Sequence, residues 1–333
     1  MAPERSAPEP LPVVRSLLSP TALAEMVALA YGLAAVRCKL IKATSRDVYR
    51  VESTSGPRIL IVYRHGSRSE AEIRAELDLL DVLSAHGVAV AQAIPARSGE
   101  CTIALAAPEG TRYAVLFHLT VGEPMIRAPG PDTARRYGEM VAQVHAVTDT
   151  WSGSAAIASR RSPLDASFLI DRPLDLISRI LEPSSSELAD LMRAAHTMRE
   201  HLVLLPKHPP GYGMIHGDVI PTNIVLGPGG ALTLLDFDFC GPGWRAFDVA
   251  TFLRDARERQ ATDGTAFLDG YQEMRRLSGW ELKALPLFMA IRSLFRLGNW
   301  GPRLDEWGTS ARPAGLIARH LAEILRDLGQ VTR

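Results

Sequence analysis

The sequence predicts an α+β fold in two lobes, a small, mostly antiparallel β-sheet lobe with one main helix and then a larger, mainly helical lobe. With 333 residues the chain is too long for one small core. Short strand-like runs come first, long stretches of helical periodicity follow, and a Gly- and Pro-containing break separates them at residues 121–124. We expect a disordered, Pro-rich tail over residues 1–18, the first lobe over 19–121 and the second over 122–333.

The first lobe is predicted from a capped helix and a series of short apolar strands. Ser19 supplies a capping hydroxyl, and Pro20 suits the first turn of the helix that follows. The strands are short apolar runs, and a longer helix-forming stretch follows the third of them. The expected elements are helices at 20–31 and 69–85 and strands at 36–41, 48–52, 59–63 and 113–119.

Glu76 lies on the apolar face of the second of these helices, three residues after Ile73 and four before Leu80. A carboxylate on an inward face needs a cation, because burial of an unpaired charge is expensive. We therefore predict that Glu76 faces inward and pairs with a basic group. The alternative is that it lies at the edge of the apolar stripe, in water.

The second lobe is predicted to be mostly helical. A helix over residues 132–147 would carry His145 beside its inner face, where we expect a packed core histidine. Residues 151–163 are rich in Ser, Ala and Arg and are typical of a loop. Further helices are expected at 187–204, 248–258, 264–277, 280–297 and 314–328.

The composition excludes several classes of protein. The formal net charge is zero, so general nucleic-acid binding has no electrostatic support. We find no run of about 18 apolar residues, and residues 1–12 lack the basic start and apolar core of a secretory signal. The three cysteines, Cys38, Cys101 and Cys240, are far apart, which argues against a disulfide framework and for a reducing cytoplasm.

The segment that begins at His216 carries the most specific pattern. It reads His216-Gly217-Asp218, with Asn223 five residues after the Asp, then a strand, a Gly/Pro turn and a second strand that ends at Asp236. This spacing is typical of a phosphoryl-transfer site, in which the first Asp is the base and the Asn and the second Asp bind metal. A hairpin between them would bring Asn223 and Asp236 together.

The residue types suit ATP chemistry. Mg²⁺ takes oxygen ligands, and Asn223 offers a neutral oxygen while Asp236 offers an anionic one. Asp218 is left to accept a hydrogen bond from an acceptor hydroxyl and to aim it at the γ-phosphate. A lone His-x-Asp is usually an ordinary turn, but here several features agree in register.

At these residues the chain resembles the aminoglycoside phosphotransferase / choline kinase-like family, small-molecule kinases with a protein-kinase-like fold. The His-Gly-Asp triplet stands where protein kinases carry His-Arg-Asp, and an Asp-Phe-Asp triplet replaces Asp-Phe-Gly. The resemblance implies that Asp218 is the catalytic base and that Asn223 and Asp236 bind Mg²⁺. It also implies that Asp248 braces the catalytic loop, and that Asp238 binds metal or orders the loop.

The chain departs from the family pattern in the strand predicted at 59–63. The family commonly carries a Lys or Arg there, which holds the nucleotide phosphates, and the equivalent position is Ile61. Because strand side chains alternate, Arg58 and Arg64 would point away from the side of Ile61 unless a bulge shifts the register. We predict that Arg64, at the strand end, is the substitute cation, with Lys42 as the second candidate.

The resemblance also implies a role in nucleotide binding for two more segments. The link at residues 44–46 would cover the ATP phosphates without the usual glycines, and an ordinary turn is an equal alternative. Backbone groups of His118 and Thr120 would face the adenine at the break between the lobes.

The resemblance therefore implies an ATP- and Mg²⁺-dependent phosphotransferase acting on a hydroxyl of a small molecule, such as an amino-acid alcohol, a sugar or a natural-product intermediate. The segment after Gly243 has at least as many basic as acidic residues, which does not favour a polycationic antibiotic. Arg292 and Arg296 lie one turn apart with Arg303 nearby; we expect them in water, the alternative being that they hold an acidic acceptor. Two other functions stay open, a kinase acting on Ser or Thr of a peptide and a non-catalytic nucleotide-binding module.

Overall fold

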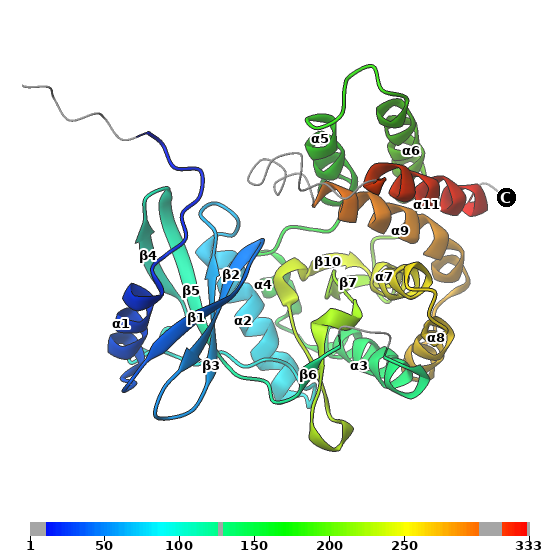
Figure 1. Cartoon of the computed structure of the whole chain (residues 1–333). Helices are drawn as coiled ribbons and strands as arrows, with labels where there is room; N and C mark the ends of the chain where they lie inside the picture. Colours follow the sequence, from blue (N-terminus) through cyan, green and yellow to red (C-terminus); the bar gives the residue numbers. More distant parts are fainter. Residues whose placement is uncertain (1–10, 126–128, 300–314, 332–333) are drawn as a thin grey trace, which may run out of the picture. The chain divides into compact units, whose positions relative to one another are not determined.

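The computed structural model describes residues 11–125, 129–299 and 315–331 (Figure 1). An antiparallel sheet characterises its N-terminal part and helices dominate its C-terminal part, so the predicted α+β class is confirmed. Within these described ranges, no helix is both long and apolar enough to cross a membrane.

The chain divides into two compact units. The first consists of Met1–Leu77 with Gln92–Leu119, and the second of Asp78–Ala91 with Thr120–Arg333. The boundary therefore falls within the long helix that carries Glu76, whose first half belongs to the first unit. We describe each unit by itself.

The first unit is built on a five-stranded antiparallel sheet in the order β1-β2-β3-β5-β4. Helix α1 begins after Ser19, whose hydroxyl accepts a hydrogen bond from the N–H of Ala22, and it ends at Gly32 in a left-handed conformation that suits glycine. The strand β4 was not predicted from the sequence. The elements are α1 (Pro20–Tyr31), β1 (Arg37–Ala43), β2 (Arg46–Glu52), β3 (Arg58–Tyr63), α2 (Glu70–Ala85), β4 (Ile103–Ala107) and β5 (Gly110–His118).

The two faces of this sheet have different partners, because successive strand residues point to opposite sides. One face forms an apolar core with α1, in which Tyr49, Leu60 and Val62 are fully buried. On the other face lies Tyr63, whose hydroxyl is 3.3 Å from a carboxylate oxygen of Glu76 on α2.

Glu76 is 3% exposed, and Ile73 and Leu80 on the same side of α2 are also buried. The prediction that Glu76 faces inward is therefore confirmed. The solvated alternative is wrong because the residues that flank Glu76 along the helix both pack inward, and a side chain between them follows the same face.

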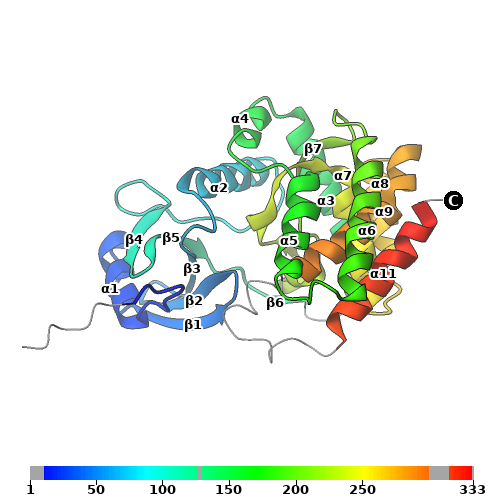
Figure 2. The same cartoon turned by 90° about the horizontal axis from the view of Figure 1, so that it is seen from above.

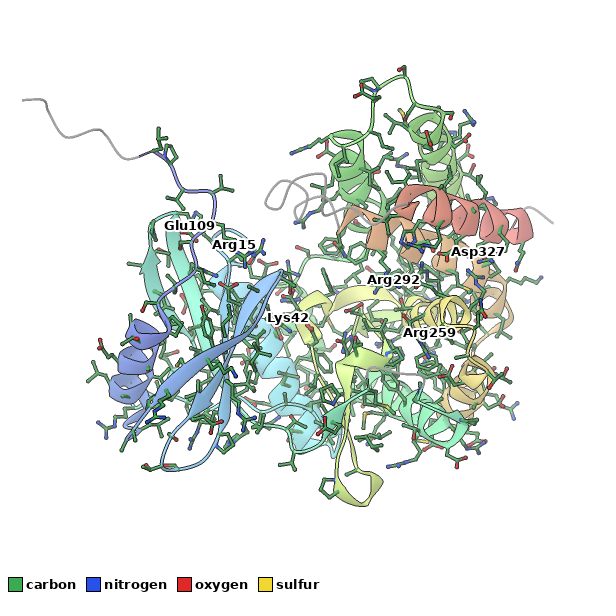
Figure 3. All side chains as sticks on the ribbon, viewed as in Figure 1. Arg15, Lys42, Glu109, Arg259, Arg292 and Asp327 are labelled. Carbon is green, nitrogen blue, oxygen red and sulfur yellow. The ribbon has the colours of Figure 1, made fainter. Side chains whose placement is uncertain are left out.

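The chain before α1 is held by carboxylates of the first unit (Figure 3). The guanidinium of Arg15 lies 2.7 Å from Asp47, which also pairs with Arg112 at 2.6 Å in a fully buried position. The Ser16 hydroxyl donates to Glu109 at 2.7 Å. Asp47 and Glu109 therefore give Arg15 and Ser16 specific partners in the first unit.

The second unit is mainly helical, and α6, α9 and α11 lie side by side in it (Figure 2). A capping box of Ser278 and Glu281 starts α9. The expected loop at 151–163 contains the helix α4 (Ser154–Ala158), a single turn too short to produce an apolar period. The other elements are β6 (Glu123–Pro124), α3 (Pro131–Thr150), α5 (Arg172–Ser178), α6 (Ser186–Val203), β7 (Tyr212–Ile215), β8 (Ile224–Leu226), β9 (Leu232–Leu234), β10 (Gly241–Trp244), α7 (Arg245–Glu258), α8 (Asp263–Met274), α9 (Gly279–Gly298) and α11 (Leu316–Val331).

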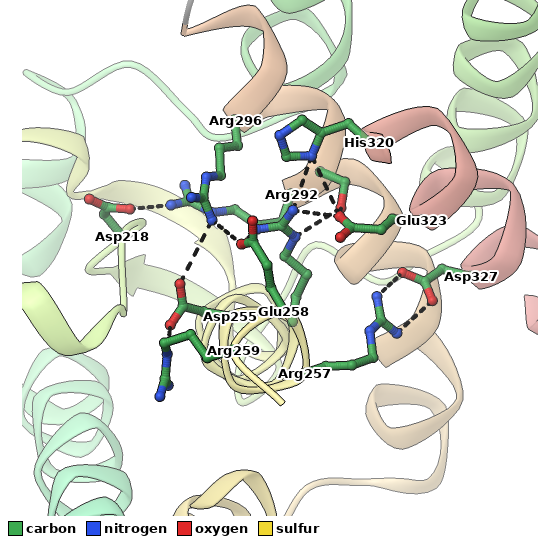
Figure 4. A network of polar contacts seen from close by, with 12 residues as sticks. Asp218, Asp255, Arg257, Glu258, Arg259, Arg292, Arg296, His320, Glu323 and Asp327 are labelled. Atoms are coloured by element: carbon green, nitrogen blue, oxygen red, sulfur yellow. Dashed lines mark hydrogen bonds and ion pairs between the residues drawn. The ribbon is translucent and has the colours of Figure 1, made fainter. Parts of the chain in front are cut away.

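Ion pairs join three helices of this unit, α7, α9 and α11 (Figure 4). Arg254 of α7 donates to the Ser293 hydroxyl of α9 at 3.0 Å and to Glu323 of α11 at 2.5 Å. Arg257 of α7 makes two parallel hydrogen bonds to Asp327 of α11, at 2.7 and 2.6 Å, and Asp327 is fully buried. These pairs fix the helix that carries Arg292.

Candidate active site

The predicted catalytic loop, residues 216–223, follows the strand β7 and depends on a glycine at its second position. Gly217 has φ +81°, a conformation that L side chains rarely adopt. A Cβ added there would lie 2.5 Å from the carbonyl oxygen of Phe239. The middle residue of the His-Gly-Asp triplet is therefore a glycine for two reasons, backbone conformation and the close approach of a neighbouring chain segment.

Asp248 braces this loop from the first turn of α7, as the sequence predicts. Its carboxylate accepts hydrogen bonds from the backbone N–H groups of His216 and Gly217, both at 2.8 Å. Its third partner is Nε2 of His145 at 3.0 Å, and Asp248 and His145 are both fully buried. Burial works to raise the pKa of Asp248, but the hydrogen bonds from the His145 side chain and the His216 backbone hold this pKa below its ordinary value.

His145 is buried, as predicted, and it also takes part in this bracing. Burial first, and then the charge of Arg245, lower the pKa of His145 to about 3, so the ring is neutral near pH 7. A neutral ring donates from Nε2 to Asp248 and accepts at Nδ1 from the hydroxyl of Tyr271, 2.8 Å away. The core histidine thus orients the carboxylate that holds the catalytic loop.

His216 connects the catalytic loop to the segment that carries Asp236. Its Nε2 lies 2.9 Å from the carbonyl oxygen of Leu235, and its Nδ1 lies 3.2 Å from the backbone N–H of Asp218. Donation from Nε2 and acceptance at Nδ1 use both ring nitrogens. The ring also packs against Phe237, with centroids 4.4 Å apart.

Asp218 is held by one partner on each carboxylate oxygen. The amide nitrogen of Asn223 donates to Oδ2 and to the backbone carbonyl of Asp218, both at 2.9 Å. The other oxygen, Oδ1, pairs with the guanidinium of Arg292. The side chain of Asp218 keeps 14% of its surface exposed. A fixed, accessible carboxylate of this kind is suited to accept a proton from a bound hydroxyl.

The hairpin of β8 and β9 brings Asn223 and Asp236 together, as predicted. Ile224 pairs with Leu234, and the N–H of Leu235 donates to the carbonyl of Asn223 at 2.8 Å. Asp236 is the next residue and has φ +65°, which is uncommon for a residue other than glycine. Asp238 is buried, and its backbone carbonyl accepts from Arg161.

Asn223 and Asp236 fit a site for Mg²⁺. The amide nitrogen of Asn223 is used by Asp218, which leaves the amide oxygen for a cation. Among the described residues no group of three or more His, Cys, Asp or Glu could hold a metal ion. The two oxygen ligands Asn223 and Asp236 are enough for Mg²⁺ bound to a nucleotide, because Mg²⁺ is usually held by one or two side chains together with the phosphates and water.

The register of the first unit adds a candidate for the cation that replaces the missing lysine. Lys42 pairs with Val48, and Val48 pairs with Ile61, so the three lie in one row across β1, β2 and β3 and share a face. Arg46 pairs directly with Tyr63, whose hydroxyl contacts Glu76, and Arg46 is buried. The sequence pattern predicts Lys42 as a candidate but not Arg46, because it places the start of this strand only at residue 48, whereas β2 begins at Arg46.

The remaining predicted residues are placed as follows. Arg64 is the first residue after β3 and its carbonyl accepts from Ser67. The backbone N–H of His118 donates to the carbonyl of Gln92 at 3.0 Å, so that donor is already used within the first unit. Thr120 belongs to the second unit.

The expectation that Arg292 is solvated is wrong. Arg292 lies on α9, its side chain is 7% exposed, and its guanidinium contacts Asp218. Arg296, one turn further on, is 38% exposed and pairs with Glu258. Arg303 lies outside the described residues. No local pattern predicts the contact, because Arg292 and Asp218 are separated by 74 residues.

Comparison with known proteins identifies the family. The sequence model described as the phosphotransferase enzyme family matches residues 37–280. A protein of Deinococcus radiodurans is 34% identical over 310 residues, which cover 90% of this chain and 86% of that protein. A homoserine kinase of Rhizobium etli is 29% identical over 296 residues, which cover 84% of this chain and 83% of that protein.

Two solved structures share the fold. A microcompartment-associated aminopropanol kinase has a TM-score of 0.76 at 23% identity, and the match covers 94% of this chain and 99% of that one. The amicoumacin kinase hAmiN, solved with AMP-PNP and Ca²⁺, has a TM-score of 0.76 at 19% identity, with 91% and 92% covered. The predicted two-lobe kinase fold is therefore confirmed. The chain belongs to the phosphotransferase enzyme family and is an enzyme that transfers a phosphoryl group to an alcohol.

Proposed function

We propose that this enzyme transfers the γ-phosphate of ATP, as its Mg²⁺ complex, to the hydroxyl of a small molecule, with Asp218 as the base. The observation that carries the proposal is the arrangement around Asp218. Asp218 belongs to a loop whose backbone N–H groups donate hydrogen bonds to Asp248, and the amide of Asn223 orients its carboxylate. The oxygen of the acceptor hydroxyl would form a bond to the γ-phosphorus while the bond from that phosphorus to the leaving ADP breaks, and Asp218 would take the hydroxyl proton.

The other proposed roles follow from position and chemistry. Asn223 and Asp236 would hold Mg²⁺ through one oxygen each, and Asp238 is a further candidate ligand or an orienting group. In the first unit, Glu76 would pair with the cation that binds the nucleotide phosphates, for which Arg64, Lys42 and now Arg46 are the candidates. Backbone groups at His118 and Thr120 would contact adenine; for His118 this role would fall to the carbonyl, because its N–H bonds Gln92.

We propose a small amino alcohol or an amino acid with a hydroxyl side chain as the acceptor. Support comes from the kinases to which this chain is similar, since an aminopropanol kinase and homoserine kinases act on such molecules. We also infer a cytoplasmic location, where ATP is available.

The test is a screen of hydroxyl acceptors with ATP and Mg²⁺, monitored by ADP release and by the mass of the product. Asp218→Asn should lower turnover about 10²- to 10⁴-fold, as expected for loss of a general base, and should leave ATP binding nearly intact. Asp190→Asn, which changes a partly exposed aspartate on α6, is the matched control. Wild-type turnover in Asp218→Asn would exclude Asp218 as the base, and no transfer to any acceptor would refute the proposed reaction.

A further inference from the structure

One buried arginine of the second unit has an unused hydrogen-bond donor next to the proposed base. Arg292 projects from α9 and is 6% exposed (Figure 4). One of its terminal nitrogens, Nη2, pairs with Oδ1 of Asp218. The other, Nη1, is buried and has no hydrogen-bond partner in the described part of the chain.

An unsatisfied donor on a guanidinium is costly in a buried position. Arginine keeps its charge at any pH that proteins meet, so it cannot avoid the cost by losing a proton. Other arginines nearby differ from it. Arg254 bonds Glu258, Ser293 and Glu323, and Arg296 pairs with Glu258 and Asp255. Arg292 therefore keeps a buried donor for an anion, whereas every guanidinium nitrogen of Arg254 has a partner.

The position of Arg292 is fixed in a way that suits ligand binding. Its guanidinium lies over the ring of Phe295, 5.6 Å from the centroid, and Phe295 is itself buried. Stacking on an aromatic ring holds the plane of the guanidinium and leaves its edge to form hydrogen bonds. A guanidinium edge matches the two oxygens of a carboxylate.

The two carboxylate oxygens of Asp218 face different groups. Oδ2 faces Asn223, the proposed metal ligand, whereas Oδ1 faces Arg292. An anion bound at Nη1 of Arg292 thus lies on the side of the base that does not face the metal ligand. That side must receive the molecule whose hydroxyl Asp218 deprotonates.

We propose that Arg292 binds a carboxylate of the acceptor, so that the enzyme acts on a hydroxy acid such as a hydroxyl-bearing amino acid. This inference rests on the proposed function, in which Asp218 marks the position of the acceptor hydroxyl. Arg292 would contact both the base and the acceptor carboxylate, and it would thereby set the distance between the hydroxyl and Asp218.

A matched pair of acceptors tests the proposal. L-Homoserine and 3-amino-1-propanol differ only in the carboxylate. We expect kcat/KM of the wild-type enzyme to be higher for L-homoserine by about 10- to 100-fold, the usual contribution of a charge-assisted hydrogen bond. In Arg292→Gln this ratio should fall to near one. If the substitution also disturbs Asp218, kcat/KM should change by the same factor for both acceptors, and this change cancels in the ratio.

Two variants complete the design. Arg292→Lys keeps the charge but loses the paired donors, so its preference for L-homoserine over 3-amino-1-propanol should lie between those of the wild type and Arg292→Gln. Arg296→Gln, one turn along α9 and paired with acidic side chains, should keep the wild-type ratio. If Arg292 instead binds the transferred phosphoryl group, Arg292→Gln will lower kcat for both acceptors equally and leave the ratio unchanged, which overturns the proposal.

Direct binding separates this proposal from the proposed function. L-2-Aminobutyrate is homoserine without its hydroxyl and cannot be phosphorylated. Calorimetry in the presence of Mg-ADP should detect its binding to the wild-type enzyme and a loss of at least 10-fold in affinity in Arg292→Gln. Absence of wild-type binding overturns the carboxylate site. If L-2-aminobutyrate binds in a way that depends on Arg292 but no acceptor is phosphorylated, the proposed reaction is wrong while the carboxylate site at Arg292 is supported.

Discussion

Two residues of the active site adopt backbone conformations that most side chains avoid. Gly217 has φ +81° and Asp236 has φ +65°. Glycine reaches this region at no steric cost, but an aspartate held there costs on the order of 1 kcal/mol or more and persists because its surroundings fix it. The hydrogen bond from Leu235 to Asn223 provides such fixation directly before Asp236. The strained aspartate is therefore the residue whose exact direction we expect to matter for metal binding.

Substitution of the two proposed metal ligands should have unequal effects. Asp236→Ala should weaken Mg²⁺-dependent binding of a non-hydrolysable ATP analogue more than Asn223→Ala does, because an anionic oxygen contributes more to a hard divalent cation. Asp236→Asn removes the negative charge without changing the preferred backbone conformation, since asparagine also tolerates a positive φ. It therefore shows how much of the effect is due to the charge. Calorimetry with and without Mg²⁺ measures the difference. Equal affinities of Asp236→Ala and the wild type would refute the metal assignment.

The sequence predicted those site residues that lie close together along the chain. Asp218 and Asn223 are five residues apart, and a short hairpin brings Asp236 beside them, so spacing alone indicated the group. The contact between Arg292 and Asp218 could not be found in this way. Almost every residue around it on α9 is buried, including Ala290, Ile291, Ser293 and Leu294. A helix that is buried on most sides has no polar face, so its pattern does not tell a buried arginine from an exposed one.

At the scale of single elements, strand register decides which cations face Glu76. A register irregularity in β1 between Leu40 and Lys42 sets the face on which Lys42 lies. Lys42 then shares a row with Ile61, two strands away, or about 10 Å at the usual strand spacing. The alternation rule applied to the sequence could not include this irregularity. It also missed Arg46, because predicted strand ends are the least reliable part of such an assignment.

Three single substitutions distinguish the candidate cations. Lys42→Met, Arg46→Met and Arg64→Met should each be compared with Arg37→Met, at the start of β1. The true phosphate-binding cation should raise KM for ATP and lower kcat together, because it supplies both position and charge. Glu76→Gln should produce a milder change of the same kind. If none of the three alters KM for ATP, no side chain among them replaces the family lysine.

At the scale of the whole molecule, helices α3, α7 and α8 of the second unit fix the catalytic loop through a chain of buried hydrogen bonds. Asp248 on α7 receives its third hydrogen bond from His145 on α3, and Tyr271 on α8 bonds the other side of that histidine. Apolar periodicity predicted these helices because each has a buried face against another. It gave no signal for the short helices between residues 154 and 178, which turn too few times to show a period.

The neutral state of His145 predicts how stability depends on pH. In the unfolded chain this histidine takes up a proton near pH 6.5, whereas burial and the charge of Arg245 lower its folded pKa to about 3. Between these values the unfolded chain binds the extra proton, so the free energy of unfolding falls as pH falls. The slope approaches about 1.4 kcal/mol per pH unit, or about 2–3 kcal/mol between pH 7 and 4.5.

Urea unfolding at several pH values tests this dependence. His145→Gln keeps a donor for Asp248 and an acceptor for Tyr271 but does not titrate, so its free energy of unfolding should change less over this window. Burial would raise the pKa of Glu323, but its pairs with His320 and Arg254 lower this pKa to about 2. The contribution of that carboxylate to stability is therefore lost mainly below pH 4.5, the lower end of the window. His196→Gln, an exposed histidine on α6, should retain the wild-type slope. A slope in His145→Gln equal to that of the wild type would show that His145 is not held neutral by the fold.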